Sequence, residues 1–141
     1  MNKILHLLIG AIGTGKSTYA EELKEKLNID VLSADKIEGD VEVELNIMQH
    51  FLESLDSGNS FILDGLNLNK KSRQLYISLA KRSGYKIYGY DFGAGDENSK
   101  NRRLNDSRNV SSERWIELVE RNKKDYEKPI IEEGFEGIFR T

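Results

Sequence analysis

The chain has 141 residues, which is the size of one domain with a single hydrophobic core, and its formal net charge of -3 excludes a general positive field for nucleic acid. The absence of cysteine excludes disulfides, thiolate metal sites and cysteine nucleophiles. No segment reaches the roughly 18 apolar residues of a membrane helix, so we predict one cytoplasmic domain over residues 1–141 with no membrane partner.

The chain begins with the pattern of a β-α-β unit. A near-continuous apolar run over Lys3–Ile9, followed by glycines, predicts a strand buried on both faces of a parallel sheet. The apolar face of Lys16–Leu27 predicts a helix that Asn28 ends, and Ile29–Ser33 predicts a short second strand.

The remaining elements continue the alternation of helices and strands. Periodicity and turn residues predict, in order, a helix over Val41–Leu55, a strand over Ser60–Leu63 that ends in Asp64, a helix around Leu75–Ala80, a strand over Tyr85–Phe92, a helix over Trp115–Tyr126 and a strand over Phe135–Phe139. Such alternation predicts a doubly wound α/β fold. The polar stretch from about 93 to 110 has few apolar residues to bury, and we expect it to form a short lid.

Residues 10–17 read GAIGTGKS and satisfy the pattern G-x-x-x-x-G-K-[ST]. The motif follows a predicted buried strand and opens a predicted helix, where backbone N–H groups and the helix dipole attract phosphate. We expect Lys16 to contact the β- and γ-phosphates of ATP, and Ser17 to hold Mg²⁺. The predicted ATP contacts are Gly10, Ala11, Ile12, Gly13, Thr14, Gly15, Lys16, Ser17 and Thr18. A plain glycine turn between strand and helix would not require the lysine and serine in register.

Two aspartates follow the second and third predicted strands, at the sheet edge where α/β proteins bind ligands. Phosphoryl transfer requires a group that accepts the proton of the attacking hydroxyl and a carboxylate that orients magnesium. We assign the first role to Asp35 and the second to Asp64. The alternative for each is an ordinary cap or turn residue.

Arginines in the predicted lid are candidates for stabilising the charge on the transferred phosphoryl group. We rank Arg108 and Arg103 as catalytic and Arg102 as a substrate-orienting residue, and a solvated charged face is the alternative for each. A second basic cluster on the third helix also allows a purely solubilising role: Lys70, Lys71, Arg73, Lys81 and Arg82.

These motifs together resemble the small P-loop kinases of the polynucleotide-kinase type, the AAA_33 group, over nearly the whole chain. Beyond the glycine loop, the resemblance rests on Leu32-Ser-Ala-Asp35, Leu63-Asp64-Gly-Leu-Asn67-Leu-Asn69, the arginine-bearing lid and Tyr126-Glu-Lys-Pro129. It implies a P-loop NTPase fold of three α/β/α layers with a mainly parallel five-stranded sheet. It also implies that Lys16 and Ser17 bind ATP and Mg²⁺, that Asp35 activates a hydroxyl, and that a lid arginine clamps the phosphates. We assign Asn67, with Asp64 and Arg102, a role in orienting the substrate.

The expected function is transfer of the γ-phosphoryl group of ATP to a hydroxyl, with a polynucleotide 5′-hydroxyl as one acceptor. The resemblance would place an arginine where this chain has Glu38, so a small-molecule kinase stays open as an alternative. A P-loop ATPase regulator without an acceptor is the second alternative, because hydrolysis requires only a positioned water.

Overall fold

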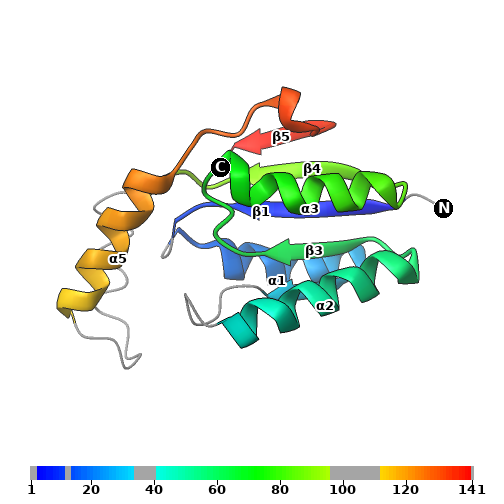
Figure 1. Cartoon of the computed structure of the whole chain (residues 1–141), viewed down its shortest axis with the longest axis horizontal. Coiled ribbons are helices and arrows are strands. Elements are labelled where there is room, and N and C mark those ends of the chain that lie inside the picture. The colour runs from blue at the N-terminus through cyan, green and yellow to red at the C-terminus, as the bar shows by residue number, and fades with distance from the viewer. Residues whose placement is uncertain (1–2, 12–13, 34–40, 96–111, 141) are drawn as a thin grey trace.

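The computed structural model describes residues 3–11, 14–33, 41–95 and 112–140. In these residues, five strands form one sheet in the order β2-β3-β1-β4-β5, and every neighbouring pair is parallel (Figure 1). The strands are β1 (Ile4–Ile9), β2 (Asp30–Ser33), β3 (Phe61–Asp64), β4 (Lys86–Asp91) and β5 (Gly137–Arg140). The predicted five-stranded sheet is therefore confirmed, with β5 at the edge beside β4.

Strand β1 lies at the centre of the sheet because nearly all of its side chains are apolar, on both faces. Leu5, Leu7 and Ile9 are fully buried on one face, and Leu8 is fully buried on the other. In the strand register, Leu8 is opposite Asp64 of β3, and Ile9 is opposite Asp91 of β4. The carboxyl ends of the three central strands therefore meet at one edge of the sheet.

Helices cover both faces of the sheet and confirm the predicted three layers. The helices are α1 (Lys16–Leu27), α2 (Val41–Ser57), α3 (Lys70–Arg82), α5 (Ser112–Asp125) and the short 3-10 helix η1 (Ile131–Glu133). Ala20 of α1 packs on the face that contains Leu8, whereas Phe51 of α2 and Ile77 of α3 pack on the opposite face. Figure 1 shows α5 beyond the carboxyl ends of the strands, away from both layers.

Local capping decides where the helices begin and end. Asn28 ends α1 as predicted, in a left-handed conformation with φ of 54°. Helix α3 begins five residues before the first apolar residue of the predicted helix, because the Asn69 side chain accepts a 2.8 Å hydrogen bond from the Ser72 amide. The polar first turn of α3 hid this start from the apolar periodicity.

None of the helices in the described ranges is long and apolar enough to cross a membrane. Of the predicted lid, only Gly93–Gly95 belong to the described residues; positions 96–110 lie outside them.

A buried histidine lies in the core on the α1 face of the sheet. His6 is 7% exposed, and its Nδ1 shares a 2.8 Å hydrogen bond with the hydroxyl of Tyr90. Burial lowers the pKa of His6 from its usual 6.5 to about 4, and burial raises the pKa of Tyr90 to about 12. The imidazole is therefore neutral in the folded protein at neutral pH, and the tyrosine retains its proton.

This shift predicts a pH-dependent stability. The unfolded chain protonates His6 near pH 6.5 while the folded protein resists protonation until about pH 4, so the free energy of unfolding should fall as the pH drops between these values. His6→Gln should flatten that part of the curve, measured by urea unfolding from pH 4 to 8. His50, which is exposed on α2, provides the control substitution His50→Gln. An unchanged slope in His6→Gln would contradict the assignment.

Candidate functional site

Backbone hydrogen bonds hold the start of the glycine loop on two sides. The Gly10 amide donates to the Leu66 carbonyl at 2.9 Å, and the Ala11 amide donates to the Gly93 carbonyl at 3.0 Å. Leu66 follows β3 and Gly93 follows β4, the two strands that flank β1. The glycine loop therefore leaves the sheet between the loop after β3 and the loop after β4, and hydrogen bonds to both fix its direction.

Two glycines of this loop meet steric demands that other residues do not. A Cβ atom on Gly10 would lie 2.7 Å from the Cβ atom of Phe92, which is closer than real Cβ contacts. Gly15 caps α1 with φ of 92°, in the left-handed region that glycine enters without steric cost. These positions of the motif are thus fixed by packing and backbone geometry.

Lys16 is the first residue of α1, and its side chain is buried against the loop. It is 4% exposed, and its Nζ donates to the Ala11 carbonyl at 3.4 Å. No acidic residue is present in the first turn of α1, so the positive end of the helix dipole is not offset there. An ammonium group, a helix N-terminus and a glycine loop at one point favour a bound anion.

Ser17 and Asp64 meet beside this helix start. The Ser17 hydroxyl donates to Asp64 Oδ2 at 3.1 Å, which joins α1 to the carboxyl end of β3. A hydroxyl and a buried carboxylate are oxygen donors of the kind that Mg²⁺ prefers. Within the described part of the chain, no group of three His, Cys, Asp or Glu side chains is placed to hold a metal. The pair therefore fits a magnesium ion that takes its other ligands from phosphate and water.

Asn67 contacts β1 directly. Its φ of 48° is left-handed, and its side-chain Nδ2 donates to the Leu8 carbonyl at 2.8 Å. The residue is 9% exposed. The predicted role of Asn67 in orienting the substrate stays a prediction, and in the structure its side chain bonds the strand that leads into the glycine loop.

Several predicted site residues lie outside the described residues, and their roles stay predictions. They are Ile12, Gly13, Asp35, Arg102, Arg103 and Arg108. The structure does describe the second basic cluster, and it separates the members: Arg73 is fully buried, whereas Lys70 and Lys71 are exposed at one end of α3 and Lys81 and Arg82 at the other. These five side chains do not form one basic surface.

Sequence reasoning missed Asp91, the last residue of β4. Its carboxylate accepts hydrogen bonds from the Gly93 amide at 2.9 Å, from the Tyr126 hydroxyl at 2.8 Å and from Arg140 at 2.6 Å. Burial, and then the bond to Asp91, raises the pKa of Tyr126 to about 12. Asp91 thus fixes the turn whose Gly93 carbonyl holds the glycine loop. Its position at a strand end, like that of Asp64, was the signal available in the sequence.

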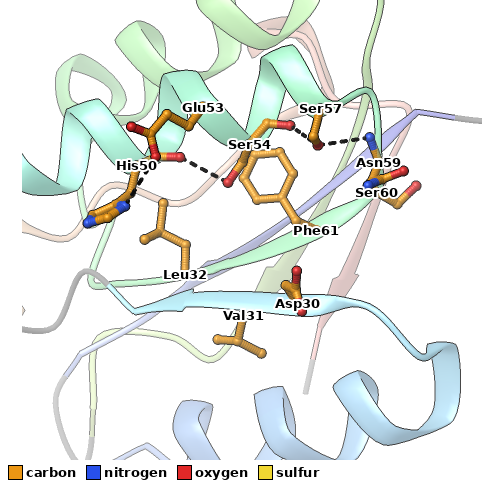
Figure 2. Close-up of a pocket in the computed structure, with 10 residues that line it drawn as sticks. All are labelled: Asp30, Val31, Leu32, His50, Glu53, Ser54, Ser57, Asn59, Ser60 and Phe61. Carbon is orange, nitrogen blue, oxygen red and sulfur yellow. Dashed lines mark hydrogen bonds and ion pairs between the residues drawn. The ribbon is translucent and has the colours of Figure 1, made fainter.

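A pocket of about 310 Å³ lies elsewhere, between α2 and the edge strand β2 (Figure 2). Its lining comprises Asp30, Val31, Leu32, His50, Glu53, Ser54, Ser57, Asn59, Ser60 and Phe61. No residue of the glycine loop is among them. The Ser54 and Ser57 hydroxyls already donate to carbonyls of α2 at 2.9 and 2.6 Å. The buried Lys16 and the Ser17–Asp64 pair, and not this pocket, mark the candidate site.

Comparison with protein families identifies the chain. The family model AAA_33, described as an AAA domain, matches residues 5–129, so the chain belongs to this family. No curated protein matches the sequence significantly.

Solved structures share the fold at low sequence identity. Chaetomium thermophilum Kti12 in complex with ADP-AlF3 has a TM-score of 0.70 and 20% identity, with 97% of this chain and 88% of that chain covered. A fungal RNA kinase has a TM-score of 0.67 and 15% identity, with coverage of 99% and 74%. A sugar kinase from Janibacter sp. has a TM-score of 0.69 and 16% identity, with coverage of 99% and 86%. The five-stranded parallel sheet with its helices is thus the P-loop NTPase fold, as predicted.

The close approach of Gly10 to Phe92 predicts a sensitive position. Gly10→Ala should lower the free energy of unfolding by about 1–3 kcal/mol, because neither Cβ atom can swing away by a rotamer change. Gly137→Ala is the matched control, since its Cβ would meet the Tyr88 ring at an ordinary 3.4 Å and should cost less than about 0.5 kcal/mol. Urea unfolding measures both, and equal losses would refute the steric argument.

Proposed function

We propose that this member of the AAA_33 family is an ATP-dependent phosphotransferase that moves the γ-phosphoryl group of ATP to a hydroxyl. The observation that carries the proposal is the convergence at the start of α1: the buried Lys16 against the glycine loop, and the Ser17 hydroxyl bonded to Asp64. Kti12, which shares this fold, was solved in complex with ADP-AlF3, and this supports nucleotide binding by the chain.

The residues of the loop would bind the donor. Backbone N–H groups of the loop and the N-terminus of α1 would surround the β-phosphate, and Lys16 would neutralise charge shared by the β- and γ-phosphates. Ser17 and Asp64 would hold Mg²⁺, directly or through water. The bound magnesium would neutralise charge on the phosphate oxygens.

The transfer step requires residues that act on the acceptor. The acceptor oxygen bonds to the γ-phosphorus as the bond to the β–γ bridging oxygen breaks, ADP leaves with that electron pair, and Asp35 accepts the hydroxyl proton. One of the arginines at 102, 103 and 108 would contact the transferred phosphoryl oxygens and stabilise their charge. In the sequence Asp35 comes two residues after Ser33, the last residue of β2, and β2 pairs with β3, which ends at Asp64.

For the acceptor, we favour a hydroxyl at the end of a polymer, such as a polynucleotide 5′-hydroxyl. Only a few residues separate Asp35 from the start of α2 at Val41, which is too short for a separate helix that closes over a small substrate. The exposed Lys70 and Lys71 at the start of α3 are compatible with an anionic polymer. The similarity to a fungal RNA kinase supports this choice.

A small-molecule acceptor is the second candidate. The similarity to a Janibacter sugar kinase favours it, as does Glu38, a negative charge three residues after the proposed base. A protein that hydrolyses ATP without an acceptor is the third candidate.

An acceptor panel separates the three candidates. With γ-labelled ATP and Mg²⁺, we expect label in 5′-hydroxyl oligonucleotides, because the segment between Asp35 and Val41 is too short for a helix that closes over a small substrate. Label only in a sugar or nucleoside would support a small-molecule kinase, and label only in inorganic phosphate would support an ATPase. Lys16→Ala should remove each signal, which excludes a contaminating kinase. No release of label under any condition would overturn the proposal.

Two substitutions separate donor binding from chemistry. Asp35→Ala should reduce transfer by about 10²–10⁴-fold while ATP affinity changes little, because its carboxylate acts on the acceptor proton. Lys16→Ala should weaken ATP binding by about 10–100-fold, as expected for loss of a charged hydrogen bond. Kinetics and calorimetric titration measure the two effects.

The controls for these substitutions are exposed residues of the same types. Lys24→Ala on α1 and Asp56→Ala on α2 should leave transfer and affinity unchanged. If Asp35→Ala transferred phosphoryl groups at the normal rate, another residue would have to be the base.

A further inference from the structure

Arg73 of α3 is a fully buried arginine with all its described bonds directed at two partners. Its Nε and Nη2 donate to Glu133 Oε1 and Oε2 at 2.8 and 3.1 Å. Its Nη1 donates to the main-chain carbonyl of Asn67 at 2.8 Å. The guanidinium therefore joins α3, η1 and the loop after β3 at one point.

The bonding explains how a full charge is tolerated in the core. A buried guanidinium and a buried carboxylate lose hydration, and only complete pairing offsets that loss. Glu133, whose side chain is 5% exposed, also accepts from the Ile130 amide at 2.9 Å, so the backbone of η1 holds the carboxylate in place. A well-packed apolar pair would hold the two helices together about as well, which points to a further role in orientation.

The loop after β3, which Arg73 bonds, contacts the end of β1 and the start of the glycine loop. The carbonyl that accepts from Arg73 belongs to Asn67, whose side chain donates to the Leu8 carbonyl of β1. One residue earlier, the Leu66 carbonyl accepts from the Gly10 amide. The same loop begins directly after Asp64, the last residue of β3, whose carboxylate accepts from Ser17. Arg73 thus acts on a loop that contacts both ends of the glycine motif.

We propose that Arg73, held by Glu133, is a positioning residue for the glycine loop. It fixes the Asn67 peptide, and through the Asn67 side chain and the Leu66 carbonyl it sets where Gly10 leaves β1. Its effect on nucleotide affinity rests on the proposed function, whereas its effect on Gly10 does not. A merely structural ion pair would stabilise the whole domain and would not act selectively on this loop.

The test is amide hydrogen exchange by NMR on the nucleotide-free chain. In Arg73→Lys, the charge stays, but an ammonium cannot bond both Glu133 oxygens and the Asn67 carbonyl in one plane. Protection of the Gly10 amide should fall by about tenfold or more, because local opening of the loop becomes easier. The Lys86 amide, which donates to the Lys3 carbonyl at the other end of the sheet, should keep its protection within about twofold.

Matched variants complete the test. Arg82→Lys, at an exposed position of the same helix, should change neither amide. If Arg73→Lys does not fold, the double substitution Arg73→Met with Glu133→Gln removes both charges and still leaves an acceptor for the Ile130 amide. It should show the same selective loss at Gly10. Equal loss of protection at Gly10 and Lys86, or no loss at Gly10, would overturn the proposal.

Nucleotide titration then separates the two proposals. Arg73→Lys should weaken binding of Mg-ATP by about 3–10-fold at a temperature where the variant is fully folded. An unchanged affinity despite selective loss of Gly10 protection would overturn the effect on binding. A native chain that binds no ATP would overturn the proposed function and leave the exchange result to decide the role of Arg73.

Discussion

The parallel pairing of β1 with β3 on one side and β4 on the other is the constraint on which the site depends. It brings Asp64 and Asp91 to the same edge as the end of β1. From there, the loops after the two flanking strands accept hydrogen bonds from Gly10 and Ala11. Because these bonds are made by the backbone, they hold the start of the glycine loop without using any of its side chains. The loop that these bonds anchor leads to Lys16 and Ser17 at the start of α1.

Buried charges gather along this edge, and each has a bonded partner. The carboxylate of Asp64 bonds Ser17, and that of Asp91 bonds a backbone amide, a tyrosine and an arginine. Arg73 bonds Glu133 and the Asn67 carbonyl. Burial penalises a charge that has no partner, so these bonds leave each group few alternative positions. Burying these charged side chains lowers the free energy of unfolding. Such a loss is compatible with a function that needs fixed charges beside a polyanionic ligand.

Much of the fold was predictable, because apolar periodicity reports burial. The near-continuous apolar run of β1 predicted a central strand, and α1 has the predicted bounds. Polar contacts were harder to predict. Asn69 capped α3 earlier than its apolar residues indicated, and Arg73, counted with the surface lysines, is fully buried against Glu133, 60 residues further along the chain. An ion pair between positions so far apart has no periodic signature.

The order of residues was enough to recognise the glycine motif and its place between strand and helix, because the motif depends on short spacings along the chain. The roles of Lys16, Ser17 and Asp64 in binding nucleotide and magnesium stay predictions. The contacts that hold the glycine motif became visible only in the folded chain. The order of the strands placed Leu66 and Gly93 beside Gly10 and Ala11, and folding brought Asn67 to Leu8 and Arg73 to Glu133. These contacts join segments that are distant in the sequence, through backbone atoms or buried charges. Backbone bonds do not depend on residue type, and a single buried ion pair has no periodic pattern, so the sequence does not reveal them.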